Sequence, residues 1–481
     1  MGMPLDKHSN PGLKKKKSGA LKSAVGKPCE ETTEAEDPES CAEYHEGIFS
    51  VLEQTDREIY DLITQEFERL RNTIQLVAAE NFCSRAVLAA LGSVFQNKTA
   101  EGFPGARLHG GCEVIDEMEQ VAIARAKQAF GAKYANVQPH SGTSANLIVL
   151  TALLERGDKI LSMGLDQGGH FSHGSKASFT GKFFNVENYY VDKDSFLLDY
   201  DAIRKQARKF SPKLIICGAS VYSRTIDFRK FREIADEAGA YLLADISHIS
   251  GLVIAGVHPS PVNYAHFTTT STYKLGGPRG GLILMGKDYD RRVKLSGTEA
   301  PLYEHIDKAT FPGAQGTPYL NHIAAKAVFF KEALSNDYKA RQLRIVENAK
   351  ALAENLVRIG YNVLTGGTDN HMILVNVGKI REGLTGRASQ KALQECGIVV
   401  DMIRLPYDKK DPMANSGIRL GTPIVTKNGM GKQEMNDISG LMDAVLRAMQ
   451  IVSEAEYRID KPLADGVKDK VRELCRKFPM R

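Results

Sequence analysis

Short apolar segments alternate with helix-like segments between residues 143 and 286, and this alternation constrains the fold more than any other feature. The apolar segments predict strands at residues 159–163, 213–218, 241–246 and 281–286, and a run rich in β-branched residues predicts another at 266–272. The segments between and before them predict helices at about residues 143–156, 199–209 and 228–239. Strands that alternate with helices form a mostly parallel sheet, and functional loops follow the ends of its strands. The sequence therefore predicts an α/β domain.

The regions on either side of this domain have different patterns. Residues 1–45 carry a lysine block and then an acidic block, with too few apolar residues to offset the entropy of ordering, so they predict a disordered tail. Residues 46–84 predict an N-terminal helical arm, because apolar residues recur at helical spacing from Ile48 to Asn72. A large domain is predicted over residues 85–325, and a small α+β domain over residues 326–481. The later helices are predicted at about 321–335, 337–358, 387–396 and 432–452, with strands in YNVL, MILVNV and IVVD.

The composition excludes several classes of protein. Of 481 residues, 42% are hydrophobic and 25% are charged, as in ordinary soluble proteins. No apolar run has the length of a membrane span, so we expect no membrane partner. The net charge is only +5, which argues against nucleic-acid binding. The seven cysteines are scattered without metal-binding spacing, which indicates reduced thiols in a cytoplasmic protein and no metal site.

An aspartate and a lysine follow two successive predicted strands. Asp245 comes at the end of the apolar run YLLADI, and Lys274 begins a loop rich in glycine and proline. A lysine can form a Schiff base with an aldehyde cofactor, and an aspartate can keep a pyridinium nitrogen protonated. The pair fits pyridoxal phosphate. Taken alone, it fits equally well a surface lysine before a turn and an aspartate that caps a helix.

Two further segments fit the same cofactor. Ser141, Gly142 and Thr143 stand at the start of a predicted helix, where free N–H groups and the helix dipole favour an anion such as phosphate. An ordinary helix cap is the more frequent meaning of such residues. His170 is flanked by glycines, which would let its ring approach a flat cofactor, although a turn histidine has the same pattern.

Two other residues fit the binding and chemistry of an amino acid. Arg419 lies in a strand-like segment between glycines, where a guanidinium can form a bidentate pair with a carboxylate. A surface arginine on an edge strand is equally compatible. Glu101 lies in a glycine- and proline-rich loop, and in an enclosed site its carboxyl group could act as a general acid or base.

From about residue 48 to residue 478 the chain resembles the serine hydroxymethyltransferase family. The resemblance lies in long segments such as AEGFPGARLHGGCE, GAKYANVQPHSGTSAN, GGHFSHGSK, GAYLLADISHISGLVIAGVHPSPV, GPRGGLIL, GGTDNH and SGIRLGT. It implies a fold-type I pyridoxal phosphate-dependent transferase, in which a mostly parallel seven-stranded sheet is sandwiched by helices and followed by a smaller α+β C-terminal domain. The large domain would bind the cofactor. The resemblance also implies a homodimer or tetramer with shared active sites.

The resemblance assigns roles to individual residues. Lys274 matches the Schiff-base lysine, Asp245 the partner of the pyridine nitrogen, and His170 the histidine stacked on the ring. The implied cofactor-binding residues are Lys274, Asp245, His170, Ser141, Gly142, Thr143, Ser220, His248, Thr272, Thr99 and Thr317. The implied catalytic residues are Lys274, Glu101, His170, His248 and Asp245, with Glu101 as the group that handles protons. The implied substrate-binding residues are Arg419, Glu101, His109 and Ala79, with Arg419 as the carboxylate-binding arginine.

Several residues around the expected site depart from the family pattern. Thr99 stands where the family has a tyrosine that reaches the neighbouring subunit's phosphate, and Leu108-His109 replaces a tyrosine pair beside the reacting centre. Ala79 replaces a serine that helps to hold the substrate carboxylate. Thr317 replaces a glycine that offers its N–H to phosphate.

A further departure concerns folate. Residues 401–404 read Asp-Met-Ile-Arg where the family has an Asn-Lys-Asn-Thr stretch that contacts the pterin, so the pterin-reading asparagine is missing. Together the departures surround the expected site, while the scaffold keeps the family pattern. Neutral drift would more often spare the site and alter the surface.

Three functions are therefore compared, with amino acids and aldehydes as small-molecule substrates. The first is folate-independent L-threonine aldolase or transaldolase chemistry, in which the Cα–Cβ bond of a β-hydroxy amino acid breaks through a glycine quinonoid and glycine passes to another aldehyde. The second is tetrahydrofolate-dependent serine hydroxymethyltransferase activity in one-carbon metabolism. The third is a non-catalytic family member that acts as a binding protein. The departures favour the first, so pyridoxal phosphate is the expected cofactor and the use of tetrahydrofolate stays open.

Overall fold

A computed structural model describes residues 45, 47–411 and 413–480 of the chain. The tail predicted over residues 1–45 lies, except for residue 45, outside the described residues. The chain divides into two units, one up to Asp56 and one from Arg57 onward. In the first, the described residues include helix α2 (Ile48–Thr55). The second contains the sheets and the candidate site.

The single helix predicted from Ile48 to Asn72 is wrong. Helix α2 ends at Thr55, and a separate helix, α3 (Arg57–Arg71), follows Asp56. Asp56 has non-helical dihedral angles, with φ −146° and ψ 85°. Thr and Asp both have low helix propensity, and Asp competes with the helix by binding nearby backbone groups. The helix is therefore interrupted at Asp56, although the apolar residues keep their helical spacing through this position.

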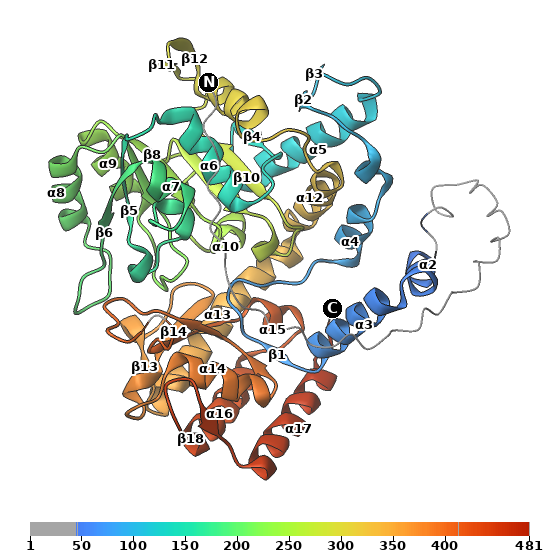
Figure 1. Cartoon of the computed structure of the whole chain (residues 1–481), viewed down its shortest axis with the longest axis vertical. Coiled ribbons are helices and arrows are strands. Elements are labelled where there is room, and N and C mark those ends of the chain that lie inside the picture. Colours follow the sequence, from blue (N-terminus) through green and yellow to red (C-terminus); the bar gives the residue numbers. More distant parts are fainter. Residues whose placement is uncertain (1–44, 46, 412, 481) are drawn as a thin grey trace, which may run out of the picture. The chain divides into compact units, whose positions relative to one another are not determined.

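A seven-stranded sheet forms the centre of the large lobe (Figure 1). Its strands, in spatial order, are β4 (Tyr134–Asn136), β10 (Gly281–Met285), β9 (Phe267–Ser271), β8 (Tyr241–Asp245), β7 (Leu214–Cys217), β5 (Lys159–Met163) and β6 (Asn185–Tyr189). Strand β10 runs in one direction, and the other strands of the sheet all run in the opposite direction. All five predicted strands are present, and the fold is the predicted α/β class with a mostly parallel sheet.

Helices cover both faces of this sheet, because alternate residues of each strand point to opposite sides. Ile215, Leu242 and Leu284 belong to one buried cluster, together with residues of α5 (Glu113–Phe130), α8 (Tyr200–Phe210), α9 (Phe228–Glu237) and α12 (Leu320–Ala333). Leu214, Leu243 and Ile283 belong to another, with residues of α6 (Gly142–Leu153) and α11 (Leu302–Lys308). The sheet is therefore buried on both faces, as a parallel sheet must be.

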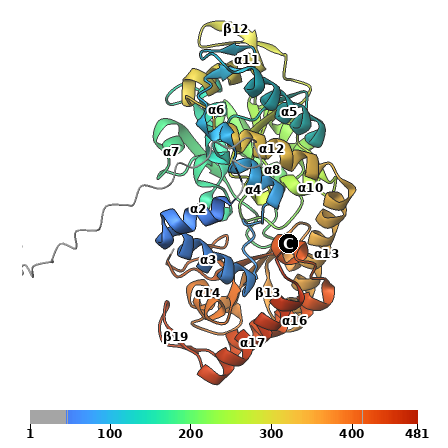
Figure 2. The ribbon, with the colours of Figure 1, turned by 90° about the vertical axis from the view of Figure 1, so that its right-hand side faces the viewer.

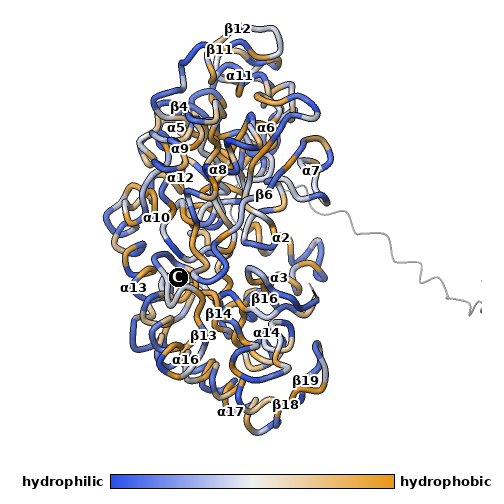
Figure 3. Tube along the Cα trace, turned by 90° about the vertical axis from the view of Figure 1, so that its left-hand side faces the viewer, coloured by the Kyte–Doolittle hydropathy of each residue, from blue (hydrophilic) through white to orange (hydrophobic). Residues whose placement is uncertain are grey.

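The small lobe has a four-stranded sheet in the order β13 (Asn362–Val363), β14 (Met372–Asn376), β17 (Gly417–Gly421) and β16 (Asp401–Ile403). Its helices include α13 (Asn336–Arg358), α14 (Gly386–Glu395), α16 (Lys432–Ala448) and α17 (Lys461–Lys477). Along α16 and α17 hydrophobic residues recur at helical spacing among hydrophilic ones, so each helix buries one side only (Figure 3). The strand predicted at IVVD is two short strands, since β15 (Ile398–Val399) pairs with β1 (Ile74–Gln75) and β16 pairs with β17.

Helix α13 connects the two lobes (Figures 1 and 2). Tyr338, near its start, packs into the core of the large lobe, whereas Ala349 and Leu352 pack into the core of the small lobe. The change from one core to the other therefore falls inside this helix. No helix among residues 45, 47–411 and 413–480 has the length and apolar character to cross a membrane.

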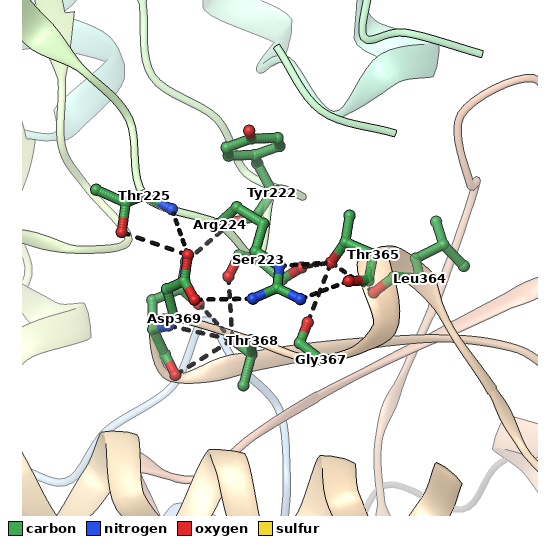
Figure 4. A network of polar contacts seen from close by, with 10 residues as sticks. Tyr222, Ser223, Arg224, Thr225, Leu364, Thr365, Gly367, Thr368 and Asp369 are labelled. Atoms are coloured by element: carbon green, nitrogen blue, oxygen red, sulfur yellow. Dashed lines mark hydrogen bonds and ion pairs between the residues drawn. The ribbon is translucent and has the colours of Figure 1, made fainter. Parts of the chain in front are cut away.

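A polar network also joins the lobes, between the loop after β7 and the segment that leads from β13 to β14 (Figure 4). Arg224 Nη1 lies 2.8 Å from Asp369 Oδ1, and Arg224 Nε donates to Thr365 Oγ1 at 3.0 Å. The backbone N–H of Thr225 donates to the other Asp369 oxygen at 3.1 Å, and the N–H of Asp369 donates to Ser223 O at 2.8 Å. This network fixes the small lobe beside the carboxyl ends of the central strands.

Candidate active site

A cavity of about 200 Å³ lies at the carboxyl ends of the central strands, where open α/β sheets bind their ligands. The loops after β4, β5, β7, β8 and β9 all contribute to it. Its lining residues are Ser141, Gly142, Thr143, His170, His173, Ala219, Ser220, Asp245, Ser247, His248, Ser271, Tyr273, Lys274 and Arg279. The cavity therefore brings together eight of the residues that the sequence singled out, from segments more than 100 positions apart.

Asp245 ends β8, and its carboxylate is held on both oxygens. Oδ2 accepts hydrogen bonds from Asn146 Nδ2 at 2.8 Å and His173 Nε2 at 3.0 Å, and Oδ1 accepts from Ser247 N at 3.0 Å and Ser247 Oγ at 2.6 Å. Burial alone raises the pKa of Asp245, but the hydrogen bond and charge of His173, with the bonds from Asn146 and Ser247, outweigh it and lower the pKa overall. The carboxylate therefore stays ionised inside the protein.

Lys274 lies in a 3₁₀ turn, Tyr273–Leu275, directly after β9. Its Nζ is 3.3 Å from Ser271 Oγ and 4.8 Å from the centre of the Tyr273 ring. The guanidinium of Arg279 lies 4.2 Å from the centre of the same ring. Two cations thus flank Tyr273 at the edge of the cavity, which is a favourable arrangement for an anionic ligand.

His170 and His248 are neutral groups at the cavity. Burial lowers the pKa of His170, the neighbouring His173 lowers it further, and Asp245 partly opposes both. The N–H of Ser172 donates to His170 Nδ1 at 3.2 Å, so the proton of the neutral ring lies on Nε2. Burial also lowers the pKa of His248 well below its usual value, with smaller effects from Lys274 and Arg419. Uncharged imidazoles can lie against an aromatic ring without the cost of a buried charge.

The glycines before His170 serve the packing of its loop. A Cβ on Gly168 would lie 2.2 Å from Val221 O, and a Cβ on Gly169 would lie 2.2 Å from Met163 O. Gly168 also has φ 108°, in the region that side chains rarely adopt. The two glycines are therefore required where this loop passes close to the backbone of its neighbours, and this close approach sets the position of His170.

Arg419 and Asp401 face each other across the small-lobe sheet. They are directly paired residues of β17 and β16. Asp401 Oδ2 lies 2.7 Å from Arg419 Nη2 and 3.1 Å from Nε, and Nη1 donates to Ser220 O at 2.5 Å. The Arg419 side chain is 10% exposed and that of Asp401 is 25% exposed. The arginine that the sequence singled out thus reaches the large lobe beside Ser220, which lines the cavity.

A second group of predicted residues lies away from this cavity. Glu101 N donates to His109 Nδ1 at 3.4 Å, and Glu101 Oε1 would lie 3.2 Å from a Cβ on Gly316. Thr317 follows Gly316 in the chain, and Thr99 is exposed two positions before Glu101. None of these four predicted residues, Thr99, Glu101, His109 and Thr317, lines the cavity of its own chain.

Three other predicted residues are also absent from the lining, and these are Arg419, Thr272 and Ala79. Thr272 is fully buried and its hydroxyl donates to Pro278 O at 2.7 Å, so it holds the loop after Lys274. Ala79 is half-buried and follows Ala78, whose carbonyl is 3.1 Å from His371 Nε2. Ser271, one position before Thr272, faces the cavity instead.

The sequence model of the family described as serine hydroxymethyltransferase matches residues 52–442, which is most of the chain. The chain belongs to the serine hydroxymethyltransferase family. Members of this family are fold-type I, pyridoxal phosphate-dependent transferases, and they bind amino acid substrates and are typically oligomeric. The family assignment therefore makes this chain an enzyme of that type.

The cavity residues fit the cofactor of the serine hydroxymethyltransferase family. Asp245 is ionised, almost completely buried and part of the cavity lining, so it could keep a pyridinium nitrogen protonated. Helix α6 presents its first turn, and Ser141, its N-cap, accepts from Ser144 N at 3.0 Å, which leaves the earlier N–H groups for an anion. A Cβ on Gly142 would lie 3.2 Å from Ser271 N, so glycine at this position avoids a close contact beside the first turn of α6. His248 Nδ1 is buried without a hydrogen-bond partner, as expected of a polar atom that faces a ligand.

The sequence reasoning missed several residues of this family's site. His173 and Asn146 donate hydrogen bonds to Asp245 Oδ2, and Ser247 donates to Asp245 Oδ1. Ser271 Oγ accepts from Lys274 Nζ. His173 and Asn146 stand in the segments GGHFSHGSK and SGTSAN, next to residues that were singled out, but nothing in the sequence indicates their partner. Among the described residues, from 45 to 480 with 46 and 412 left out, no group of three or more His, Cys, Asp or Glu side chains could hold a metal ion.

Proposed function

We propose that this enzyme makes and breaks the Cα–Cβ bond of β-hydroxy amino acids without folate, as an L-threonine aldolase or transaldolase that passes glycine from threonine to another aldehyde. The observation that carries this proposal is the carboxylate at position 401. Where the folate-using pattern of the family has an Asn-Lys-Asn-Thr stretch that contacts the pterin, this chain has Asp-Met-Ile-Arg at residues 401–404, and the carboxylate of Asp401 is engaged by Arg419 at 2.7 Å. The stretch that would contact folate therefore lacks the pterin-reading asparagine, and its first residue carries a charge that pairs with Arg419.

The cofactor would be held by residues of the large lobe. Lys274 Nζ would be the amine that binds its aldehyde carbon, Asp245 would hold the ring nitrogen, His170 would lie against the ring, and the start of α6 from Ser141 to Thr143 would bind the phosphate. When bound, the cofactor supplies an electron sink for the bond that breaks at Cα. Asp245 supports this sink because its carboxylate remains ionised and therefore stabilises a positive charge on the ring nitrogen.

The substrate would be oriented from the small lobe. Arg419 is buried, charged and directed at Ser220, so its remaining N–H groups can bind the carboxylate of an amino acid. This contact fixes the rotation of the amino acid about its Cα–N bond. Arg419 would thereby orient the bonds at Cα relative to the residues of the large lobe that would hold the cofactor.

Proton transfer at the substrate hydroxyl would come from a neighbouring subunit. Glu101 and His109 are in contact with each other but do not line the cavity of their own chain. We therefore assign them to the cavity of a second copy, where Glu101 takes the proton from the β-hydroxyl oxygen and His109 lies on the aldehyde side. Thr99 and Thr317, which are outside the cavity as well, would lie near the phosphate of that second copy. A homodimer is the smallest assembly that satisfies this geometry.

Tetrahydrofolate-dependent serine hydroxymethyltransferase activity is the second candidate, because one observation is compatible with it. Glu101, His170 and Arg419 all keep the residue types of the family's proton-handling, ring-stacking and carboxylate-binding positions. These residues do not depend on the folate contacts, so they support both reactions. The second candidate requires folate to bind beside Asp401 without the asparagine.

The two candidates differ in their preferred donor. The holoenzyme should be assayed with serine plus tetrahydrofolate and, separately, with threonine and no folate. The proposal predicts a higher kcat/KM for threonine and no stimulation of either reaction by tetrahydrofolate. A folate-dependent cleavage of serine that exceeds threonine cleavage would replace the proposal with the second candidate.

We also propose a cytoplasmic location. Cys83, Cys112, Cys217, Cys396 and Cys475 are free thiols. Thiols that remain unpaired are typical of a reducing compartment. Fractionation of cells that express the full-length chain, followed by immunodetection, tests this assignment. Recovery in a membrane-enclosed or secreted fraction would contradict it.

A further inference from the structure

The guanidinium of Arg419 has more donors than its contacts use. Arginine carries five N–H groups in one plane. Asp401 Oδ2 takes the Nε–H and one N–H of Nη2, and Ser220 O takes one N–H of Nη1. Each of Nη1 and Nη2 therefore keeps one N–H beyond these contacts. A ligand carboxylate can bind to those two atoms while Asp401 stays in place.

The contact between Asp401 and Arg419 is fixed by the backbone. The two residues are register partners in adjacent antiparallel strands, β16 and β17, so their side chains are neighbours on the same face of the sheet. Asp401 could leave the guanidinium only if its side chain changed rotamer and left a largely buried cation unpaired. The ion pair is therefore a permanent part of the site rather than a stand-in for the substrate.

The pKa of a second carboxyl group, that of Glu80, responds to the charge of Asp401. Burial raises the pKa of Glu80, and among nearby charges Asp401 raises it further, whereas Arg69 and Arg279 lower it. Glu80 and Asp401 are thus close enough to feel each other's charge.

We propose that Asp401 is a specificity-determining residue of this site, which selects ligands with a single negative charge. This inference rests on the proposed role of Arg419 in binding the substrate carboxylate. Asp401 cancels the net charge of Arg419 but leaves one N–H on each of Nη1 and Nη2 without a contact, so a monoanionic carboxylate can still accept hydrogen bonds from the guanidinium. A ligand with a second negative charge gains no further attraction and meets the repulsion of Asp401. The same repulsion disfavours any anionic cosubstrate on this side of the cavity.

The test compares two ligands that differ in charge at the same position. Glycine has a carboxylate with one negative charge, and aminomethylphosphonate has a phosphonate with close to two at about pH 8. The dissociation constant of each is measured from the change in cofactor absorbance of the holoenzyme and, independently, by calorimetry. The quantity of interest is the ratio of the two constants within each variant, because general effects on folding or cofactor content cancel.

Asp401→Asn should lower the phosphonate-to-glycine ratio by on the order of tenfold, because one repulsive charge has been removed at short range. Asp401→Ser, a smaller neutral variant, should lower it similarly and serves if Asp401→Asn does not fold. Asp401→Glu keeps the charge and should keep the ratio within about twofold. Asp437→Asn is the matched control, since it removes a charge from an exposed position of α16 in the same lobe. A ratio in both neutral variants that equals that of Asp437→Asn would overturn the proposal.

Arg419→Lys distinguishes this inference from the function on which it rests. Lysine keeps the charge but lacks the fork of N–H groups, so glycine should bind more weakly. If Arg419→Lys binds glycine as the unmodified enzyme does, Arg419 is not the carboxylate-binding group and the proposed function fails with the inference. If Arg419→Lys weakens glycine binding but the neutral variants of Asp401 leave the ratio unchanged, only the inference fails.

Discussion

His173 Nε2 lies 3.0 Å from Asp245 Oδ2, and both side chains are almost completely buried. Among the contacts that lower the pKa of Asp245 against the effect of burial, the contact with His173 has the largest effect. An aspartate in a cavity is not by itself a base for a pyridinium nitrogen, because desolvation would protonate it. His173 therefore determines whether Asp245 can serve the cofactor.

His173→Asn should reduce activity more than it reduces stability. The loss of a hydrogen bond to a charged group costs about 1.5–3 kcal/mol, which corresponds to roughly a 10- to 100-fold decrease in kcat if the bond supports the ionised Asp245. The measurements are kcat, the fraction of cofactor retained after dialysis, and the thermal midpoint. An unchanged kcat and cofactor content would show that Asp245 keeps its charge without His173.

Arg419→Ala should weaken the binding of amino acids by about 2–5 kcal/mol, because a charge-assisted contact with the carboxylate is lost. It should also destabilise the small lobe, since Asp401 is left without its partner. Arg419→Ala combined with Asp401→Ala should therefore unfold at a higher denaturant concentration than Arg419→Ala alone. The double variant should still bind amino acids weakly. Equal midpoints for the single and double variants would mean that Asp401 is well solvated without Arg419.

Mixed oligomers test whether active sites are shared. Lys274→Ala and Glu101→Ala should each be inactive, but mixing and reassembly should restore activity if each cavity takes Glu101 from a neighbour. In a mixed dimer one cavity carries both changes and the other carries neither. With half of the dimers mixed and half of their cavities intact, about one quarter of the original activity should return. Recovery of none of it would place Glu101 in the cavity of its own chain.

Much of the fold follows from sequence alone, and the exceptions have physical causes. The strands β7, β8 and β10 are mostly apolar runs and β9 is a buried run rich in threonine, because a parallel sheet is buried on both faces and favours β-branched residues. Strand β6 was missed because it lies at the sheet edge, where its residues are alternately exposed and part-buried, and β4 because it has three residues only. Helix α17 was not predicted, although its buried residues recur at helical spacing.

The candidate site is less predictable, because its contacts join distant segments. Asn146 reaches Asp245 across 99 positions, and Arg419 reaches Ser220 across 199. The pairing of Asp401 with Arg419 depends on the register of β16 and β17, which the sequence does not specify. Thr272 illustrates the same limit. It stands two positions before Lys274, but the chain turns there and its hydroxyl binds Pro278 O, so Ser271 faces the cavity.

The polar network between the lobes should contribute measurably to stability. Arg224→Ala removes the ion pair with Asp369 and the bond to Thr365 shown in Figure 4, and should lower the free energy of unfolding by about 1 kcal/mol, since Asp369 is partly exposed. Arg229→Ala is the matched control, because Arg229 pairs with Glu233 on the surface of α9 and such pairs contribute little. Equal effects of the two changes would mean that the network does not hold the lobes together.

Asp307 should make stability depend on pH. Its carboxyl group accepts from Tyr134 OH at 2.5 Å, and burial raises its pKa to about 6 from an ordinary value of 3.8, while the Tyr134 bond partly opposes the rise. Between about pH 4 and pH 6 the folded chain therefore binds this proton more tightly than the unfolded chain does, so the contribution of Asp307 to stability falls as the pH rises.

Asp307→Asn removes this titration. The free energy of unfolding of the variant, relative to that of the unmodified enzyme, should therefore increase from about pH 4 to about pH 6 by on the order of 2 kcal/mol. Urea unfolding at a series of pH values measures the difference. A difference that is constant over this range would mean that Asp307 has its ordinary pKa in the folded protein.

The central claim is that the glycine fragment passes from threonine to another aldehyde without folate. The most direct measurement is the rate of acetaldehyde release from threonine by the holoenzyme, with and without an added acceptor aldehyde and with and without tetrahydrofolate. We predict that the acceptor aldehyde stimulates release, that a new β-hydroxy amino acid forms in equal amount, and that tetrahydrofolate changes neither. No release from threonine under any of these conditions, together with folate-dependent cleavage of serine, would contradict the claim.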